Sequence, residues 1–254
     1  MKKYNSEWTP TPSFLYRNYL YLKIARKLLG GKRFLDVGAG NGEFLKQLSH
    51  LGFKGESIDL SDEAVEFAKH NLRFEKDVIV KKGNIFTYKT NEKYDIIFSF
   101  ETLEHIEEDE LAMRKIFALL KPGGTFVMSV PAHMAEWSKI DEMKGHQRRY
   151  EHKELEDKLK NSGFLIKNFY SYGFPVLWFI RGLSNNGKFL ISKTQHLGKK
   201  ERSLESSIQR EYNPNLEFLV KNKLIMLPLF KIMDLFLNTD LGLGYIVVSS
   251  KPEK

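Results

Sequence analysis

The sequence predicts a doubly wound α/β fold, with a seven-stranded, mostly parallel sheet and a helical insertion before the last strand. Two observations carry this prediction. Short apolar segments alternate with segments of helical apolar spacing between residues 33 and 170. One of the short segments, Tyr94–Phe100, is apolar at nearly every position, which is typical of a strand buried on both faces of a parallel sheet.

The individual elements follow from spacing and from start and stop signals. A helix is expected over 14–29, because Gly30 and Gly31 follow it as a stop signal, and Ser61 is a candidate N-cap for a later helix. Strands are expected over 33–38, 56–60, 78–80, 94–100, 125–130, 164–170 and 243–249, and further helices over 42–51, 62–72, 107–120 and 152–162. The last two strands are expected to pair antiparallel at one end of the sheet.

The length of 254 residues suits one domain with an insertion. We expect an N-terminal helical cap over 1–32, a sheet core over 33–173 and 243–254, and an apolar and basic helical insertion over 174–242. The insertion contains two apolar clusters, Phe174–Ile180 and Leu224–Phe230, and charged residues interrupt both before either could span a bilayer. It is therefore interpreted either as a lid over the substrate or as a peripheral membrane contact.

Composition excludes some function classes. The chain has no cysteine, so disulfides, thiolate nucleophiles and zinc–thiolate sites are excluded. The polar N-terminal residues favour a cytoplasmic protein, with possible membrane association through the insertion. The net charge is +8, and residues 181–231 hold ten Lys/Arg against four Glu. This excess fits either simple solubility or a basic surface for an anionic partner.

A glycine-rich turn follows the first strand, in Asp36-Val37-Gly38-Ala39-Gly40-Asn41-Gly42. Ligands of doubly wound sheets bind at the carboxyl ends of strands, where glycine lets the backbone approach them closely. Asp36, directly before the turn, suits a cationic ligand with an α-amino group better than a phosphate. Asp59 ends the second strand, where a carboxylate can accept both hydroxyl hydrogens of a ribose. Asn84, after the third strand, suits an adenine edge, with Ile85 against the ring face.

These motifs, taken in order along the chain, resemble those of class I S-adenosylmethionine-dependent methyltransferases, which have a Rossmann-like fold. The resemblance covers roughly residues 33–170 and recurs at 243–250. It implies S-adenosyl-L-methionine as cofactor, bound by Asp36, Gly38, Gly40, Gly42, Asp59, Leu60, Asn84, Ile85, Phe100 and Glu101. An N-terminal residue, Arg17, is interpreted either as a contact to the cofactor carboxylate or as an ordinary surface residue of its helix.

The end of the fourth strand carries Glu101, Glu104 and His105 in an E-x-x-E-H pattern. Positions i, i+3 and i+4 share one face of a helix, so these side chains are expected to converge on a divalent metal such as Mg²⁺. The pattern is similar to those of quinone-biosynthesis O-methyltransferases and of small-RNA 3′-terminal 2′-O-methyltransferases, which implies metal use. The alternative is that His105 only caps the strand end, as in metal-free relatives. His105 is also a candidate catalytic base.

A second charged segment follows the fifth strand, in Asp141-Glu-Met-Lys-Gly-His-Gln-Arg-Arg-Tyr150. His146 is a candidate general base or fourth metal ligand, and His133 is a weaker candidate base. Arg148, Arg149 and Tyr150 are expected to hold an acidic group of the substrate. The alternative is that this loop covers the site with its charges paired among themselves.

The sequence thus favours a methyltransferase that O-methylates a small hydroxylated acceptor, and the apolar insertion favours an amphipathic or lipid-linked one. Two alternatives stay open. One is an RNA 2′-O-methyltransferase, which the E-x-x-E-H resemblance and the basic stretch favour. Against it, the apolar clusters of the insertion are too aliphatic to stack bases. The other is a non-catalytic cofactor-binding module. N- and C-methylation also stay open, because neither needs a metal.

Overall fold

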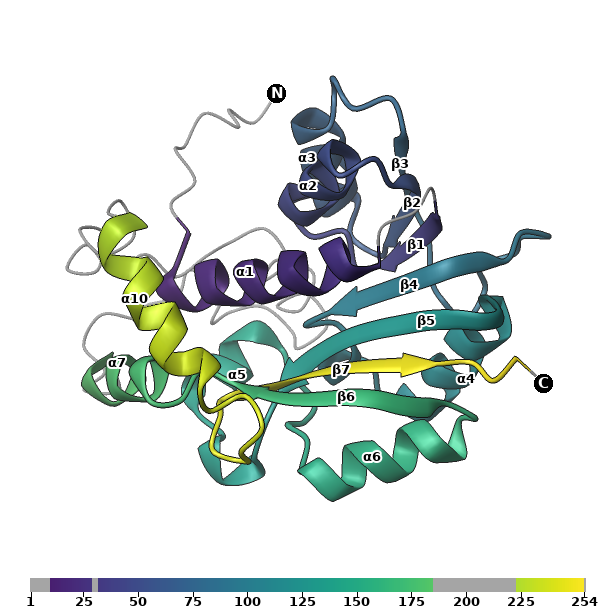
Figure 1. Cartoon of the computed structure of the whole chain (residues 1–254). Helices are drawn as coiled ribbons and strands as arrows, with labels where there is room; N and C mark the ends of the chain where they lie inside the picture. The colour runs from purple at the N-terminus through teal and green to yellow at the C-terminus, as the bar shows by residue number, and fades with distance from the viewer. Residues whose placement is uncertain (1–9, 29–31, 185–222, 254) are drawn as a thin grey trace.

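The computed structural model describes residues 10–28, 32–184 and 223–253, and Figure 1 shows their arrangement around one central sheet. The sheet has seven strands in the order β3-β2-β1-β4-β5-β7-β6. Their bounds are β1 Arg33–Val37, β2 Lys54–Asp59, β3 Val78–Lys82, β4 Tyr94–Phe100, β5 Leu120–Pro131, β6 Leu165–Tyr172 and β7 Gly244–Ser250. This confirms the predicted doubly wound, seven-stranded sheet.

Six strands run in the same direction, and one strand, β7, runs against them. β1 pairs in parallel with both β2 and β4, β2 pairs with β3, and β4 pairs with β5. β7 lies between β5 and β6 and is antiparallel to both of them. The expected antiparallel pairing of the last two strands at one end of the sheet is confirmed. The chain order reverses between β1 and β4, which makes their carboxyl ends the ligand-binding edge of such a sheet.

Helices cover both faces of the sheet and bury two apolar clusters. On one face, α1 (Pro12–Lys27), α2 (Glu43–His50) and α3 (Asp62–Asn71) pack against Phe34 and Phe98. On the other face, α4 (Asp109–Leu119) and α6 (His152–Asn161) pack against Leu35 and Ile97. Adjacent residues of one strand thus point to opposite faces, and this is why the central strands are apolar at consecutive positions.

Local sequence signals set the helix starts. Ser61 accepts a hydrogen bond from Ala64 N at 3.1 Å, which confirms it as the N-cap of α3. Thr11 caps α1 in the same way through Phe14 N at 3.2 Å, and Pro12 occupies the first turn. The first helix therefore begins two residues earlier than apolar spacing alone predicts. The stop signal expected at Gly30 and Gly31 lies outside the described residues.

Several elements differ from the sequence-based expectation. β5 begins at Leu120, whereas the sequence predicts a strand that starts at residue 125. Residues 121–124, between the predicted helix and the predicted strand, therefore belong to β5. The link between β3 and β4 has turns but no helix. Two short 3₁₀ helices follow strands, η1 at Leu103–His105 and η2 at Met134–Glu136. Part of the segment expected to be a loop forms helix α5, Lys139–Lys144, which ends at Gly145 in a left-handed conformation with φ 72°.

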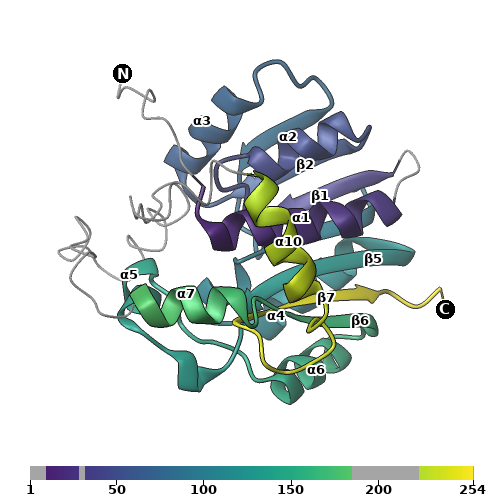
Figure 2. The ribbon, with the colours of Figure 1, turned by 60° about the vertical axis from the view of Figure 1, so that its left-hand side comes forward.

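The described part of the insertion consists of two helices, α7 (Val176–Ser184) and α10 (Lys223–Asp234). They contact each other, and α10 lies against α1 (Figure 2). Met226, Phe230 and Met233 of α10 are buried in the same cluster as α1. None of the helices within the described ranges combines the length and the apolar character needed to cross a bilayer.

A buried carboxylate, Asp109, ties helix α4 to α6 and to the segment before it. Asp109 is 4% exposed and accepts hydrogen bonds from the Tyr150 hydroxyl at 2.8 Å and from Lys158 Nζ at 2.7 Å. Arg148 Nη1 lies 3.0 Å from its other oxygen. Burial acts to raise the pKa of Asp109, but Lys158 and Tyr150 outweigh it, so the pKa lies below its ordinary value.

We expect the substitution Asp109→Asn to lower the free energy of unfolding by about 2 kcal/mol at neutral pH, because an amide is a weaker acceptor than a charged carboxylate. Urea denaturation followed by circular dichroism measures this loss. The stability that Asp109 contributes is present above the ordinary carboxyl pKa and is lost as the pH falls through the lower folded-state value. The difference between wild type and variant should therefore shrink in acid.

The matched control is Glu110→Gln, on the same turn of α4. The Glu110 side chain is more than one third exposed, and among the residues that the structure describes its ion pair is with Arg114, at 3.4 Å. Its loss should leave stability nearly unchanged. Equal destabilisation by the two substitutions would contradict the role assigned to Asp109.

Candidate functional site

The glycine turn after β1 has the backbone that the sequence predicts. Gly38, Gly40 and Gly42 have φ values of 105°, 51° and 75°, a region that side chains disfavour. At Gly38, a Cβ atom would lie 2.2 Å from Thr102 Oγ1, and that hydroxyl donates to Val37 O at 3.1 Å. The turn is therefore held directly against the segment that follows β4.

Two aspartates border this turn. Asp59, at the end of β2, accepts hydrogen bonds from Gly40 N at 3.1 Å and from Ser61 N at 2.8 Å. Asp36 is 3% exposed and accepts from Ser57 Oγ at 2.6 Å. Burial, with a smaller contribution from Asp59, raises the pKa of Asp36 to about 8. Near neutral pH, Asp36 is thus a protonated group that a nearby cation would favour in its ionised form.

The residues expected around an adenine ring lie beyond the ends of β2 and β3. Leu60 directly follows β2 and is half exposed, whereas Ile85 is buried among core residues that include Ile58. Asn84 accepts a hydrogen bond from Phe86 N at 2.9 Å through Oδ1. Its side-chain oxygen therefore shapes the local turn, and its amide nitrogen is the group left for a donor contact.

Helix α1 reaches the site through Arg17, which forms an ion pair with Glu101. Glu101 also accepts hydrogen bonds from Ser129 Oγ at 2.9 Å and from the Tyr172 hydroxyl at 3.2 Å. Burial acts to raise the pKa of Glu101, but Arg17 and Ser129 outweigh it, so the pKa is lowered. Arg17 is therefore not an ordinary surface residue, since it neutralises an internal carboxylate, and its contact to the cofactor carboxylate stays a prediction.

The expectation that Glu101, Glu104 and His105 share one helix face is wrong. Glu101 has a left-handed backbone with φ 53°, and only Leu103–His105 form a helix, which is 3₁₀. The turn geometry that underlies i, i+3 and i+4 contacts is therefore absent here. Glu101 points to Arg17, while the group that the fold brings together consists of Glu104, His105 and His146.

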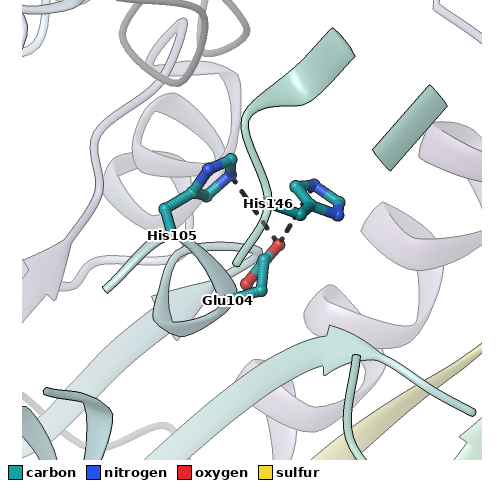
Figure 3. A group of neighbouring side chains, drawn as sticks. All are labelled: Glu104, His105 and His146. Atoms are coloured by element: carbon teal, nitrogen blue, oxygen red, sulfur yellow. Dashed lines mark ion pairs between the residues drawn. The ribbon is translucent and has the colours of Figure 1, made fainter. Parts of the chain in front are cut away.

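Figure 3 shows this second group, which joins the segment after β4 to the segment after α5. The Nε2 atoms of His105 and His146 lie 4.0 Å and 3.9 Å from Glu104 Oε1. The two imidazole rings meet edge to face, with centroids 4.8 Å apart. Within the described residues, neither carboxyl oxygen of Glu104 has a hydrogen-bond partner, although the side chain is completely buried.

Burial controls the charges of the group. It raises the pKa of Glu104 well above its ordinary value, and the charge of Glu101 adds to this effect. It lowers the pKa of His105 to about 3, with a further contribution from His146. It also lowers the pKa of His146, although Asp141 acts in the opposite direction. Near neutral pH, the carboxyl group therefore keeps its proton and both imidazoles are neutral bases.

The donor atoms of this group suit a divalent cation. The potential ligand atoms lie within 4.8 Å of one another, and the unpartnered buried carboxyl supplies an oxygen. Ligands around an octahedral ion sit about 2.1 Å from it, so neighbouring ligand atoms are about 3 Å apart and the three side chains would have to close. Two imidazoles with one carboxylate fit a transition metal better than Mg²⁺.

The cationic residues after His146 are used inside the protein. Arg149 binds the Asp141 carboxylate and Ala132 O, and Arg148 binds Glu107 O at 2.7 Å. Tyr150 is fully buried. This arrangement favours the interpretation in which the charges of the loop are paired among themselves over the one in which Arg148, Arg149 and Tyr150 hold substrate.

The weaker candidate base, His133, belongs to a separate cluster. Its Nδ1 lies 3.3 Å from Glu151 and its Nε2 lies 3.6 Å from Asp240. Its ring also packs edge-on against Tyr245. The structure therefore gives His133 partners of its own and groups only His105 and His146.

Several residues of the site escaped the sequence-based prediction. Tyr21 stacks on Phe100 with ring centroids 3.7 Å apart and shares a 2.6 Å hydrogen bond with Ser129. Tyr172 reaches Glu101 from the end of β6. No sequence pattern marks these two tyrosines. Asp141 could have been found, because it begins the charged segment whose histidine it contacts.

Comparisons with known proteins identify the family of the chain. A family model described as a methyltransferase domain matches residues 28–173, more than half of the chain. The ubiquinone biosynthesis O-methyltransferase of Xanthomonas campestris pv. campestris is 33% identical over 108 residues, or 41% of this chain and 45% of that protein. The protein of the same name from Haemophilus ducreyi is 28% identical over 138 residues, or 49% and 58%. The alignments thus span about half the length of these curated relatives.

Solved structures share the fold over nearly the whole chain. The cyclase SpnF has a TM-score of 0.63 at 18% identity, over 95% of this chain and 82% of that one. A Haemonchus contortus phosphoethanolamine N-methyltransferase 2, in complex with S-adenosyl-L-methionine, has a TM-score of 0.61 at 21% identity, over 95% and 54%. These likenesses show the fold, and the family match adds the lineage: the chain belongs to the class I S-adenosylmethionine-dependent methyltransferases.

Proposed function

We propose that the protein transfers a methyl group from S-adenosyl-L-methionine to the hydroxyl oxygen of a small acceptor. The observation that carries this proposal is the meeting of two imidazoles, His105 and His146, at one oxygen of Glu104. His105 lies on the segment that Thr102 holds against the glycine turn. A hydroxyl group must lose its proton as it is methylated, and a neutral imidazole can accept that proton. A module that only binds the cofactor has no use for such bases.

The residues present fit the cofactor. The left-handed glycines leave room for a ligand against the backbone, and Asp59 offers a carboxylate for the ribose. Asp36 suits the cationic α-amino end, Leu60 and Ile85 suit the adenine faces, and the assignment extends to Asn84, Phe100 and Glu101. When bound, the cofactor supplies an activated methyl group whose carbon–sulfur bond breaks as the acceptor oxygen forms its new bond to carbon.

The chain then has two tasks, to orient the acceptor and to take its proton. Positioning in a near-attack geometry lowers the barrier because the entropy of encounter is already lost on binding. We assign the proton to Nε2 of His146 or of His105, since both atoms face the same carboxyl oxygen of Glu104. Glu101 is a weaker base for this role, because its ion pair with Arg17 lowers its pKa.

The same three side chains support a second use, as ligands of a divalent cation. Glu104, His105 and His146 would hold the ion, which would lower the pKa of a bound acceptor hydroxyl. The proposed set keeps Glu104, His105 and the candidate fourth ligand His146 from the sequence analysis, and it leaves out Glu101. The RNA alternative gains no support, since most of the basic stretch lies outside the described residues and Arg181 pairs with Glu136.

Calorimetry with S-adenosyl-L-methionine and S-adenosylhomocysteine tests the cofactor site first. Because the pKa of Asp36 is about 8, ionising it beside a cationic ligand should release a proton at pH 7. Affinity should therefore rise with pH until about 8, and the binding heat should depend on the ionisation enthalpy of the buffer. Asp36→Asn should abolish the buffer dependence. Binding without proton release in the wild type would contradict the assignment of Asp36.

Substitutions of the two histidines test the chemistry. His105→Asn and His146→Asn should each reduce turnover by about 10²- to 10⁴-fold while cofactor affinity stays near wild type. The measurement is methyl transfer to catechol-like and lipid-linked hydroxyl acceptors. Dialysis against EDTA separates the two uses, because loss of turnover that a divalent metal restores indicates a ligand role.

His133→Asn is the matched control for these substitutions, because that histidine lies in its own cluster with Glu151 and Asp240. It should keep wild-type turnover. Full activity in both the His105 and the His146 variants would remove the proposed chemistry.

We further propose that α7 and α10 contact an anionic membrane surface, which suits an amphipathic or lipid-linked acceptor. Trp178 and Phe179 of α7 are 51% and 63% exposed, and Leu235, just after α10, is 79% exposed. Further exposed apolar residues near them are Leu227, Ile232 and Leu241. The stretch that contains these helices is rich in lysine and arginine, which complements anionic lipid.

Co-sedimentation with phosphatidylcholine vesicles, with and without phosphatidylglycerol, tests this contact. The double substitution Trp178→Ser and Phe179→Ser should weaken sedimentation with anionic vesicles several-fold, because it removes exposed apolar area. Phe74→Ser is the control, since Phe74 is 77% exposed but lies between α3 and β3. Equal binding by wild type, double variant and control would refute the proposal.

A further inference from the structure

Asp141, in helix α5, is the most heavily hydrogen-bonded carboxylate near the site. It is completely buried and accepts from His146 Nδ1 at 3.0 Å. Arg149 donates to both of its oxygens, from Nε at 2.9 Å and from Nη2 at 3.1 Å. Ser138 donates twice to Oδ2, from its backbone nitrogen and from its hydroxyl, each at 2.9 Å. The proposed chemistry uses none of these contacts directly.

The pattern of donors fixes the protonation state of the carboxylate. The Arg149 guanidinium, which stays positively charged at all ordinary pH values, donates to both carboxyl oxygens, and this pairing keeps Asp141 ionised. An ionised carboxylate can only accept hydrogen bonds. His146 must therefore carry its hydrogen on Nδ1, which leaves the lone pair of the neutral ring on Nε2.

The orientation of His146 is as constrained as its tautomer. Its backbone nitrogen donates to Asp141 O at 3.0 Å, and Gln147 N, the next along the chain, donates to Glu104 O at 2.7 Å. The ring is thus tied on one side to α5 and on the other to the segment after β4. Figure 3 shows His146 beside Glu104 and His105, with its Nε2 3.9 Å from Glu104 Oε1.

Arg149 connects this arrangement to the sheet. Its Nη1 donates to Ala132 O at 2.9 Å, immediately after the end of β5. The next residue, Tyr150, donates from its backbone nitrogen to Pro131 O at 3.0 Å and accepts from His133 N at 2.9 Å. A continuous chain of contacts therefore runs from the rigid end of β5 through Arg149 and Asp141 to the imidazole.

We propose that Asp141 is a positioning residue that, anchored by Arg149, holds His146 as the Nδ1–H tautomer with Nε2 directed to the reaction centre. The D-E-x-x-G-H-x-R-R-Y segment then serves to orient a histidine, and its arginines serve that orientation rather than substrate binding. The use of Nε2, as base or as metal ligand, rests on the proposed function. The assignment of the hydrogen to Nδ1 is independent of that function.

The substitution Asp141→Asn makes the proposal testable, because its amide must place an NH₂ group where an acceptor was. The Oδ2 side faces Ser138 N and the Oδ1 side faces Arg149 Nε, and neither of these donors can become an acceptor. The Ser138 hydroxyl on the Oδ2 side could accept from the amide, so the substitution is made together with Ser138→Ala. His146, on the Oδ1 side, is then the neighbour that can reverse its role by moving its hydrogen to Nε2. We therefore expect the tautomer to change in this double variant, and turnover to fall about 10²-fold or more.

Long-range ¹H–¹⁵N NMR of histidine-labelled protein reads the tautomer directly. The chain has seven histidines, and the signal of His146 is identified as the one that disappears in His146→Asn. The wild type should show His146 with hydrogen on Nδ1, and the double variant, Ser138→Ala with Asp141→Asn, should show it on Nε2. Ser138→Ala alone is the matched control, because it removes one donor to the same carboxylate without touching the histidine, and should keep both tautomer and turnover.

Each result decides the proposal. Hydrogen on Nε2 in the wild type overturns it even if the double variant fails to fold, and so does an unchanged tautomer in the folded double variant. A changed tautomer with wild-type turnover overturns the assigned use of Nε2. Failure of the proposed function looks different, since calorimetry then detects no cofactor binding while the NMR signature of His146 stays as expected.

Discussion

The missing side chain at Gly38 is the constraint on which the site depends. Thr102 Oγ1 occupies the space that a Cβ atom would need, so the segment after β4 lies directly against the turn after β1. That contact needs a residue without a Cβ atom, and glycine also readily adopts the φ of 105° found at this position. Glu104 and His105 lie two and three residues after Thr102, so the contact holds the imidazole group near the glycine turn. A single glycine thus brings together the residues proposed to bind the cofactor and those proposed to accept the proton.

Charge is distributed unevenly around that edge. Two carboxylates, Glu101 and Asp141, are each paired with a guanidinium and have lowered pKa values. Between them lies Glu104, buried without such a partner among the described residues and held in its protonated form. The unpaired acid makes the surroundings of both histidines low in charge, which favours their neutral forms. The two ion pairs, Arg17–Glu101 and Arg149–Asp141, hold their side chains in place. The imidazoles of His105 and His146 have lowered pKa values and stay uncharged.

Sequence reasoning found what local pattern encodes. The alternation of strands and helices, the glycine turn and the Ser61 cap depend on neighbouring residues, and the fold and the α3 start were predicted correctly. Contacts between distant residues were not predictable. Arg17 and Glu101 are 84 residues apart, and Tyr172 and Glu101 are 71 apart. The shared helix face expected for Glu101 failed because residue spacing carries no information about a single left-handed backbone angle. Glu101 points to Arg17 instead, and His146, from another segment, lies beside Glu104.

Helix α1 links the insertion to this chemistry. Its inward side carries Arg17, paired with Glu101, and Tyr21, stacked on Phe100. On another side, Tyr16, Tyr19 and Lys23 all donate to Asp234 at the end of α10, at 3.1, 3.0 and 2.8 Å. The rings of both tyrosines also pack against Phe230 of α10. One rigid helix therefore contacts a carboxylate of the site and a carboxylate of the insertion, so a displacement of α10 relative to the sheet must break one set of contacts or carry α1 with it. Helix α1 therefore connects the insertion mechanically to the Arg17–Glu101 ion pair.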